Sequence, residues 1–94
     1  MLITRDIFVK KFTWSEKKNK WLKKHRNISF EEVLERIADH ILDVKGNIKH
    51  KDQKLFIIEI HNYPWVVPFK ETKDEIFLIT AFPDRRLKEE FGYE

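Results

Sequence analysis

The stretch that decides the fold is residues 75–86, Glu-Ile-Phe-Leu-Ile-Thr-Ala-Phe-Pro-Asp-Arg-Arg. Its first part, residues 76–82, is an apolar run of strand length, and a strand sends successive side chains to opposite faces of a sheet. One face would carry Ile76, Leu78 and Phe82, and the other Phe77, Ile79 and Ala81. Because both sets are apolar, the pattern predicts a central strand with both faces covered.

The chemistry changes where this run ends. Pro83 lacks a backbone donor and should stop the strand, and Asp84 is a favourable N-cap for a short closing helix. Arg85 and Arg86 would then lie beside free backbone N–H groups, which together with two guanidinium groups form a phosphate site. The alternative is a solvated arginine pair at the end of a strand.

Length and composition restrict the possible classes of protein. A chain of 94 residues is long enough for a single domain, residues 1–94, with one core. It contains no cysteine, which fits a reducing cytoplasm, and its four histidines are dispersed, so we expect no metal and no cofactor. No apolar run reaches the roughly 20 residues that cross a bilayer, so we expect a soluble protein without a membrane partner.

Positive charge is concentrated near the N-terminus. Residues 10–26 contain eight basic residues and one acidic residue, a net charge of +7, whereas the whole chain carries +3. Such a block indicates an anionic partner, with nucleic acid as the first candidate, or else a solvated helix face. Trp14 and Trp21 lie within the block, where they either stack on bases or belong to the core.

The N-terminal half predicts one strand and two helices. Residues 7–14 are rich in β-branched and aromatic side chains, and Ser15 can cap a helix over residues 16–25. Asn27 tolerates the left-handed backbone of a helix end. Ser29 and Glu32 then form a capping box that opens an amphipathic helix over residues 30–43.

The C-terminal half predicts three strands. The pattern predicts a polar connection over residues 43–53. It then predicts a strand at 55–60, a tight turn at His61-Asn62 and a strand at 63–69. Two prolines within this last strand indicate a bulge or a ladder left incomplete on one side, namely Pro64 and Pro68.

Together these elements predict an α+β domain of order β-α-α-β-β-β. We expect an antiparallel sheet, two helices packed on one face and a short C-terminal helix. The other face is also apolar, around Leu55, Ile57, Phe77 and Ile79. Either the C-terminal segment with Leu87 and Phe91 covers that face, or a partner protein does.

Four motifs in a fixed order carry a resemblance to a known family. They are Trp14 with Lys17-Lys18-Asn19 and Leu22-Lys23-Lys24; Arg-Asn-Ile-Ser-Phe-Glu-Glu at 26–32; Tyr63-x-x-Val66-Val67-Pro68-Phe69; and Phe77-Leu78-x-Thr80 through Pro83-x-Arg85-Arg86. Across residues 12–88 the chain resembles the BrnT family of toxins from bacterial type II toxin–antitoxin systems. It departs from that pattern with Asn27 for a usual glycine, Asp84 for a common serine and Ile79 for a frequent lysine. The last two changes remove a cation and add an acid beside the expected phosphate site, so we expect weakened activity.

The resemblance implies a RelE-like ribonuclease fold, metal-independent cleavage of RNA and neutralisation by a small antitoxin. That antitoxin would also bind DNA, with a ribbon-helix-helix-like fold, and the complex would be a hetero-oligomer. The chemistry suits this chain because RNA supplies its own nucleophile, the 2′-hydroxyl. The protein then needs only to position the backbone, stabilise charge and assist proton transfer.

Residue types suggest candidates for each role. Arg85 and Arg86 would stabilise charge, with Lys54 or Lys24, while His61, Tyr63 and Glu31 or Glu32 are candidates for proton transfer. Each of the latter also has an ordinary structural interpretation, as a turn residue, a sheet residue or a capping partner. The residues expected to bind the RNA backbone are Lys17, Lys18, Lys24, Arg26 and Lys54.

Two other functions remain compatible with these residues. A nucleic-acid-binding module without catalysis would use only the basic block at 10–26 and its tryptophans. A scaffold subunit would instead use the apolar sheet face to dock a partner. Incubation with RNA separates the first alternative from the nuclease, because binding without cleavage would favour the module.

Overall fold

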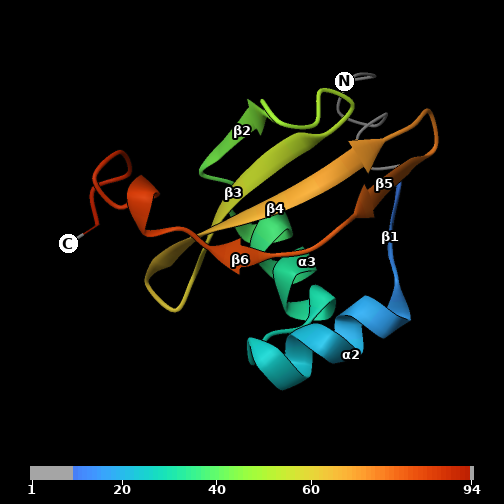
Figure 1. Cartoon of the computed structure of the whole chain (residues 1–94), viewed down its shortest axis with the longest axis horizontal. Helices are drawn as coiled ribbons and strands as arrows, with labels where there is room; N and C mark the ends of the chain where they lie inside the picture. The colour runs from blue at the N-terminus through green and yellow to red at the C-terminus, as the bar shows by residue number, and fades with distance from the viewer. Residues whose placement is uncertain (1–9, 94) are drawn as a thin grey trace.

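A computed structural model describes residues 10–93 of the chain, as an α+β domain (Figure 1). Its elements, in chain order, are β1 (Lys11–Trp14), α2 (Glu16–His25), α3 (Phe30–Asp39), β2 (Asp43–Gly46), β3 (Lys54–Ile60), β4 (Tyr63–Glu71), β5 (Glu75–Leu78), β6 (Phe82–Pro83) and the 3₁₀ helix η1 (Arg85–Leu87). The strand order in the sheet is β1-β5-β4-β3-β2, and β6 pairs with β4. The first part of the strand expected at 7–14, residues 7–9, lies outside the described residues.

Both helices begin at the predicted caps. The Ser15 hydroxyl accepts the backbone N–H of Lys18 at 3.2 Å, and the Ser29 hydroxyl accepts that of Glu32 at 3.1 Å. Asn27 adopts the left-handed backbone with φ 57°, just beyond Arg26, the C-cap of α2. The prediction of α2 is therefore confirmed at both ends.

The second helix is shorter than expected, and an edge strand follows it. α3 ends at Asp39 rather than at residue 43, because His40 has an extended backbone with φ −165°. The chain then forms β2, antiparallel to β3, where a polar connection was predicted. Asp43 and Lys45 made this segment look like a loop, but an edge strand with one solvated side tolerates such residues.

The hairpin between β3 and β4 forms at the predicted turn. His61 and Asn62 have φ values of 53° and 63°, as a two-residue type I′ turn requires, and Ile60 pairs with Tyr63 across it. Pro64 and Pro68 leave the ladder incomplete on one side, because neither has a backbone N–H. Their carbonyl oxygens instead accept hydrogen bonds, from Asp84 at 3.1 Å and from Ile79 at 2.9 Å.

The predicted continuous strand at 76–82 is wrong. Leu78 pairs with Phe69 and Phe82 pairs with Val66, so three residues, 79–81, stand against two residues of β4. This extra residue is a β-bulge, and it moves Phe82 to the face opposite Leu78. Phe77 is 37% exposed, so β5 is not covered on both faces as expected.

The sheet is mixed rather than antiparallel. β1 runs parallel to β5, with Lys11 opposite Glu75 and Trp14 opposite Leu78. A parallel pair needs a crossover connection, which the two helices and the β2–β4 strands supply here. The coarse α+β class is as expected, but the all-antiparallel arrangement is not.

One core lies between the helices and one face of the sheet, called here the helix-side face. α3 lies against this face, and α2 lies beside it at the end of the sheet (Figure 1). The core residues are Leu22, Ile28, Phe30, Val33, Ile37, Phe56, Ile58, Ile60, Trp65, Val67, Phe69, Ile76, Leu78 and Ala81. Among residues 10–93, no helix is long and apolar enough to cross a membrane.

A buried polar side chain beside this core joins the two helices. Asn19 has no exposed surface. Its Oδ1 accepts the backbone N–H of Phe30 at 2.8 Å, and its Nδ2 donates to the Glu31 carboxylate at 2.9 Å. The start of α3 is therefore held by α2 as well as by its own cap.

Candidate functional site

Three of the four predicted catalytic residues come together at one end of the sheet. His61, Tyr63 and Arg85 line a hollow of about 480 Å³, whose remaining wall is apolar: Ile60, Trp65 and Pro83. We call it the hairpin-end hollow. The first two residues come from the β3–β4 hairpin, and Arg85 is the first residue of η1, more than 20 positions later in the chain. Sequence distance alone gave no reason for them to meet.

Arg85 is placed by the β4–β6 pairing and by its own helix cap. Pro83 pairs with Trp65, and Asp84 donates its N–H to the Pro64 carbonyl at 3.1 Å, which extends the ladder to the residue before Arg85. The Asp84 carboxylate then accepts the N–H of Arg86 at 3.0 Å and caps η1 as predicted. Arg85 therefore leaves the sheet beside Tyr63.

His61 faces a carboxylate from another element. Its side chain is 73% exposed, and its Nε2 lies 3.6 Å from Oε2 of Glu32, in the first turn of α3. Glu31 is turned away, because it accepts the hydrogen bond from Asn19, which is the main cause that holds its pKa below the usual range. Of the two candidate glutamates, the structure therefore brings Glu32 to the site.

Lys88 lies next to this hollow without lining it, and the sequence patterns did not single it out. Its Nζ lies 5.5 Å from the centre of the Tyr63 ring. The signal was present in the spacing, because residues three apart in a 3₁₀ helix lie on the same side, and Lys88 follows Arg85 by three.

Arg86 does not join Arg85. Its guanidinium donates to both carboxylate oxygens of Asp84, from Nε at 3.0 Å and from Nη2 at 2.9 Å. These hydrogen bonds are the main cause that lowers the pKa of Asp84 and raises that of Arg86. The predicted arginine pair is therefore divided between two sides of the molecule.

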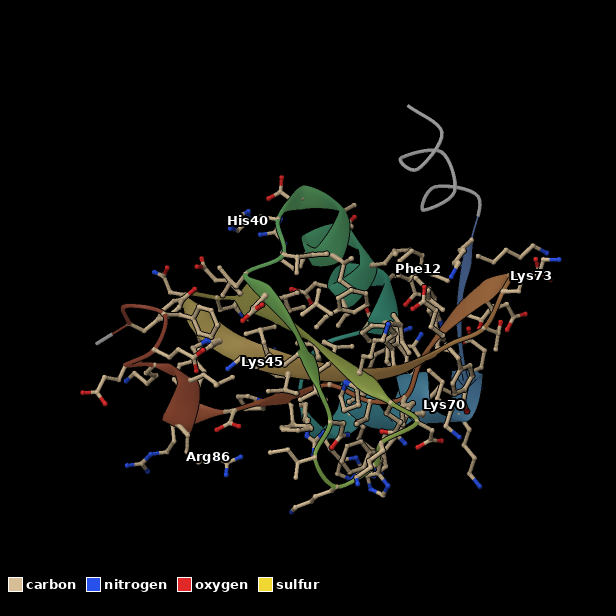
Figure 2. All side chains as sticks on the ribbon, turned by 90° about the horizontal axis from the view of Figure 1, so that it is seen from above. Phe12, His40, Lys45, Lys70, Lys73 and Arg86 are labelled. Carbon is tan, nitrogen blue, oxygen red and sulfur yellow. The ribbon has the colours of Figure 1, made fainter. Side chains whose placement is uncertain are left out.

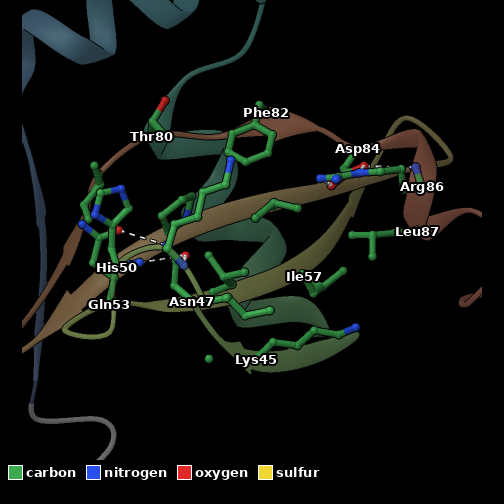
Figure 3. Close-up of a pocket in the computed structure, with 17 residues that line it drawn as sticks. Lys45, Asn47, His50, Gln53, Ile57, Thr80, Phe82, Asp84, Arg86 and Leu87 are labelled. Atoms are coloured by element: carbon green, nitrogen blue, oxygen red, sulfur yellow. Dashed lines mark hydrogen bonds and ion pairs between the residues drawn. The ribbon is translucent and has the colours of Figure 1, made fainter.

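Arg86 lies instead at a second hollow, of about 710 Å³, on the other face of the sheet (Figure 3). We call that side the open face and this the open-face hollow. Its apolar lining includes Leu55, Ile57, Val66, Pro68, Ile79, Phe82 and Leu87.

The C-terminal segment covers part of the open face, one of the two predicted alternatives. Glu90 pairs with Lys45 at 2.7 Å, the Tyr93 hydroxyl donates to Glu59, and Leu87 lines the hollow. Ile57 is left only 1% exposed, whereas Phe77 stays more open. Burial and the bond to Glu59 raise the pKa of Tyr93 to about 12.

The five predicted RNA-binding residues separate into two groups. Lys17 and Lys24 are exposed on α2, where Lys18 lies 4.1 Å from the centre of the Trp21 ring. Arg26 instead donates from Nη1 to the Ala81 carbonyl at 2.7 Å, and Lys54 pairs with Glu71 at 3.2 Å. The last two therefore have structural partners.

The tryptophans of the basic block differ from each other. Trp14 stacks on Phe30 at 5.6 Å and packs against the core. Trp21 is half-exposed, but its ring stacks with His25 at 4.6 Å and also lies beneath Arg26 at 4.8 Å. Neighbouring side chains thus already contact the Trp21 ring that a base would use.

No three His, Asp or Glu side chains within residues 10–93 form a group that could hold a metal ion. Comparison of the chain with protein-family models, with curated proteins and with solved structures found no match.

Proposed function

We propose that this chain is an endoribonuclease that cleaves RNA without a metal, by attack of the 2′-hydroxyl on the adjacent phosphate. The observation that carries the proposal is the meeting of His61, Tyr63 and Arg85 at one hollow, with Glu32 beside the histidine. A cation, a titratable group and a carboxylate within one open site are what this reaction needs from a protein.

Each side chain has a role in this proposal. Arg85 binds the phosphate and stabilises the charge that develops on its oxygens in the transition state. His61 transfers a proton to or from the reacting oxygens, and Glu32 holds its imidazole. Tyr63 forms part of the wall of the hollow that holds His61 and Arg85. Lys17, Lys18 and Lys24 of α2 attract the RNA backbone.

We further propose that the protein is a BrnT-like, RelE-like toxin that acts in the cytoplasm. Support comes from the order of the four motifs and from the folded positions of two of them. The Ser29–Glu32 capping box opens α3 and places Glu32 near His61, while the last motif, which ends at Arg85-Arg86, brings Arg85 to the hairpin-end hollow. A small DNA-binding antitoxin, ribbon-helix-helix-like, would neutralise it in a hetero-oligomeric complex.

The test is incubation of the purified protein with RNA in excess EDTA. We expect cleavage products with 2′,3′-cyclic phosphate ends, because the 2′-hydroxyl is the nucleophile. Lys73→Ala is the matched control for variants that remove a positive charge from the site. It also removes one positive charge, but Lys73 lies at the opposite end of the sheet from Arg86 (Figure 2). A wild-type protein that cleaves only with added Mg²⁺ or Zn²⁺ would contradict the mechanism.

A complex with the antitoxin has its own test. The exposed cations of α2 and the apolar open face offer charge and area to an acidic, partly apolar partner. We expect a stable complex that buries on the order of 1,000 Å² or more. Hydrogen exchange with and without the protein encoded next to this one should show protection on α2, β3 or β5. Protection on none of these would contradict this assignment of the surface.

A further inference from the structure

Lys88 is held on the same side of η1 as Arg85. Its backbone N–H donates to the Arg85 carbonyl at 3.1 Å, which closes one 3₁₀ turn. Side chains at positions i and i+3 eclipse each other in such a turn. Arg86, between them, is turned toward Asp84.

Both cations of this turn lie near Tyr63, Arg85 in the lining of the same hollow and Lys88 just outside it. Arg85 lines the hairpin-end hollow with Tyr63, and Lys88 Nζ lies 5.5 Å from the centre of the Tyr63 ring. Within residues 10–93, neither forms an ion pair, whereas Lys45, Lys54, Lys70 and Arg86 each pair with a carboxylate. Two neighbouring cations without an acidic partner repel each other, and a bound anion relieves this repulsion.

We infer that Lys88 is a second phosphate-binding cation of the site and contacts the phosphate that Arg85 holds. This inference rests on the proposed ribonuclease function and names a residue beyond those already assigned. Arg85 offers a planar fork that fits two phosphate oxygens, while the compact ammonium of Lys88 can meet a third. The charge that accumulates on these oxygens during 2′-hydroxyl attack would be shared by both side chains.

Two measurements on the full chain test this. The first is the single-turnover cleavage rate of an RNA oligonucleotide by wild type, Lys88→Ala, Lys88→Arg and the control Lys73→Ala. We expect Lys88→Ala to be about 10- to 100-fold slower, somewhat less than the loss of a principal donor. Lys88→Arg should recover most of the rate, and Lys73→Ala should match wild type.

The second is binding of the same oligonucleotide with 2′-O-methyl groups, which cannot be cleaved, across a range of salt concentrations. Each phosphate contact to a single strand contributes about 0.7 to the slope of log K against log salt. We expect the slope for Lys88→Ala to be less steep by about that amount, with Lys88→Arg and Lys73→Ala close to wild type. Thermal unfolding confirms that each variant is folded.

The outcomes separate this inference from the proposed function. If wild type cleaves RNA and Lys88→Ala keeps both rate and slope, the inference about Lys88 is wrong. If only the slope changes, Lys88 contacts a different phosphate, which also overturns it. If wild type binds the oligonucleotide through Lys88 but cleaves no RNA, the nuclease proposal fails while the phosphate contact stands.

Discussion

Arg26 donates a hydrogen bond from Nη1 to the carbonyl oxygen of Ala81 at 2.7 Å, which joins the end of α2 to the β-bulge at residues 79–81. The same guanidinium lies 4.8 Å from the centre of the Trp21 ring. Residues of a bulge fall outside the regular ladder, so a bond from another element fixes their position. Arg26 thereby orients the chain that leads to Arg85.

We predict that Arg26→Ala lowers the free energy of unfolding by about 1.5–3 kcal/mol, the usual contribution of a hydrogen bond to a charged group. Urea unfolding measures it. The control is Arg36→Ala, since Arg36 is exposed and forms only a 3.8 Å pair with Asp39; it should cost about 0.5 kcal/mol or less. Unchanged stability with weakened RNA binding would instead make Arg26 a nucleic-acid contact.

Asn19→Ala should destabilise the fold by about 1–3 kcal/mol, because it leaves the Phe30 N–H without its buried acceptor. Lys20→Ala, on the exposed side of the same helix, should stay within about 0.5 kcal/mol of wild type. Chemical denaturation at neutral pH compares the two variants. If Asn19→Ala lowered the free energy of unfolding only slightly, the Ser29 cap alone would be enough to start α3.

The same substitution has a dependence on pH. The bond from Asn19 lowers the pKa of Glu31 below its usual 4.5, so the carboxylate stabilises the fold above that pH and loses this effect as the pH falls through its folded pKa. The difference in stability between wild type and Asn19→Ala should therefore narrow below pH 4.5. Denaturation across that range measures the difference, and a constant gap would contradict the assigned cause.

The two adjacent arginines should differ sharply in their effect on cleavage. Arg85→Ala should slow RNA cleavage by about 10²–10³-fold, the cost of removing one donor that stabilises transition-state charge. Arg86→Ala should cost less than about tenfold, because Arg86 binds Asp84 at the other hollow, where it contributes no such donor. Single-turnover cleavage rates of the two folded variants measure this difference. Equal losses would restore the predicted arginine pair as one site.

Tyr93 should ionise only at high pH. Burial, and then the bond to Glu59, raise its pKa to about 12, so its contribution to stability is complete below the ordinary value of 10 and is lost as the pH rises through 12. Absorbance at the phenolate band should show a component near pH 12 that is absent in Tyr93→Phe. An unchanged titration curve would mean that the C-terminal segment does not hold this contact.

Local chemistry made several elements predictable. Ser15 and Ser29 cap their helices, His61-Asn62 forms the hairpin turn, and Asp84 caps η1, because each depends on neighbours a few residues away. The bulge at 79–81 was not predictable, because the register between β6 and β4 creates it. The same register brought Arg85 to His61 and Tyr63 and left Arg86 with Asp84.

The length of the segment between β5 and β6 has a consequence for insertions and deletions. Three residues there oppose two on β4. Deletion of one of them would leave two residues opposite two, which removes the bulge but keeps Phe82 opposite Val66 on the open face. Deletion of two would pair Phe82 with Val67 instead, which would turn Phe82 into the core and carry the arginine that follows toward the other side of the sheet. The segment can therefore lose one residue, but not two, before a different surface of the molecule presents Arg85.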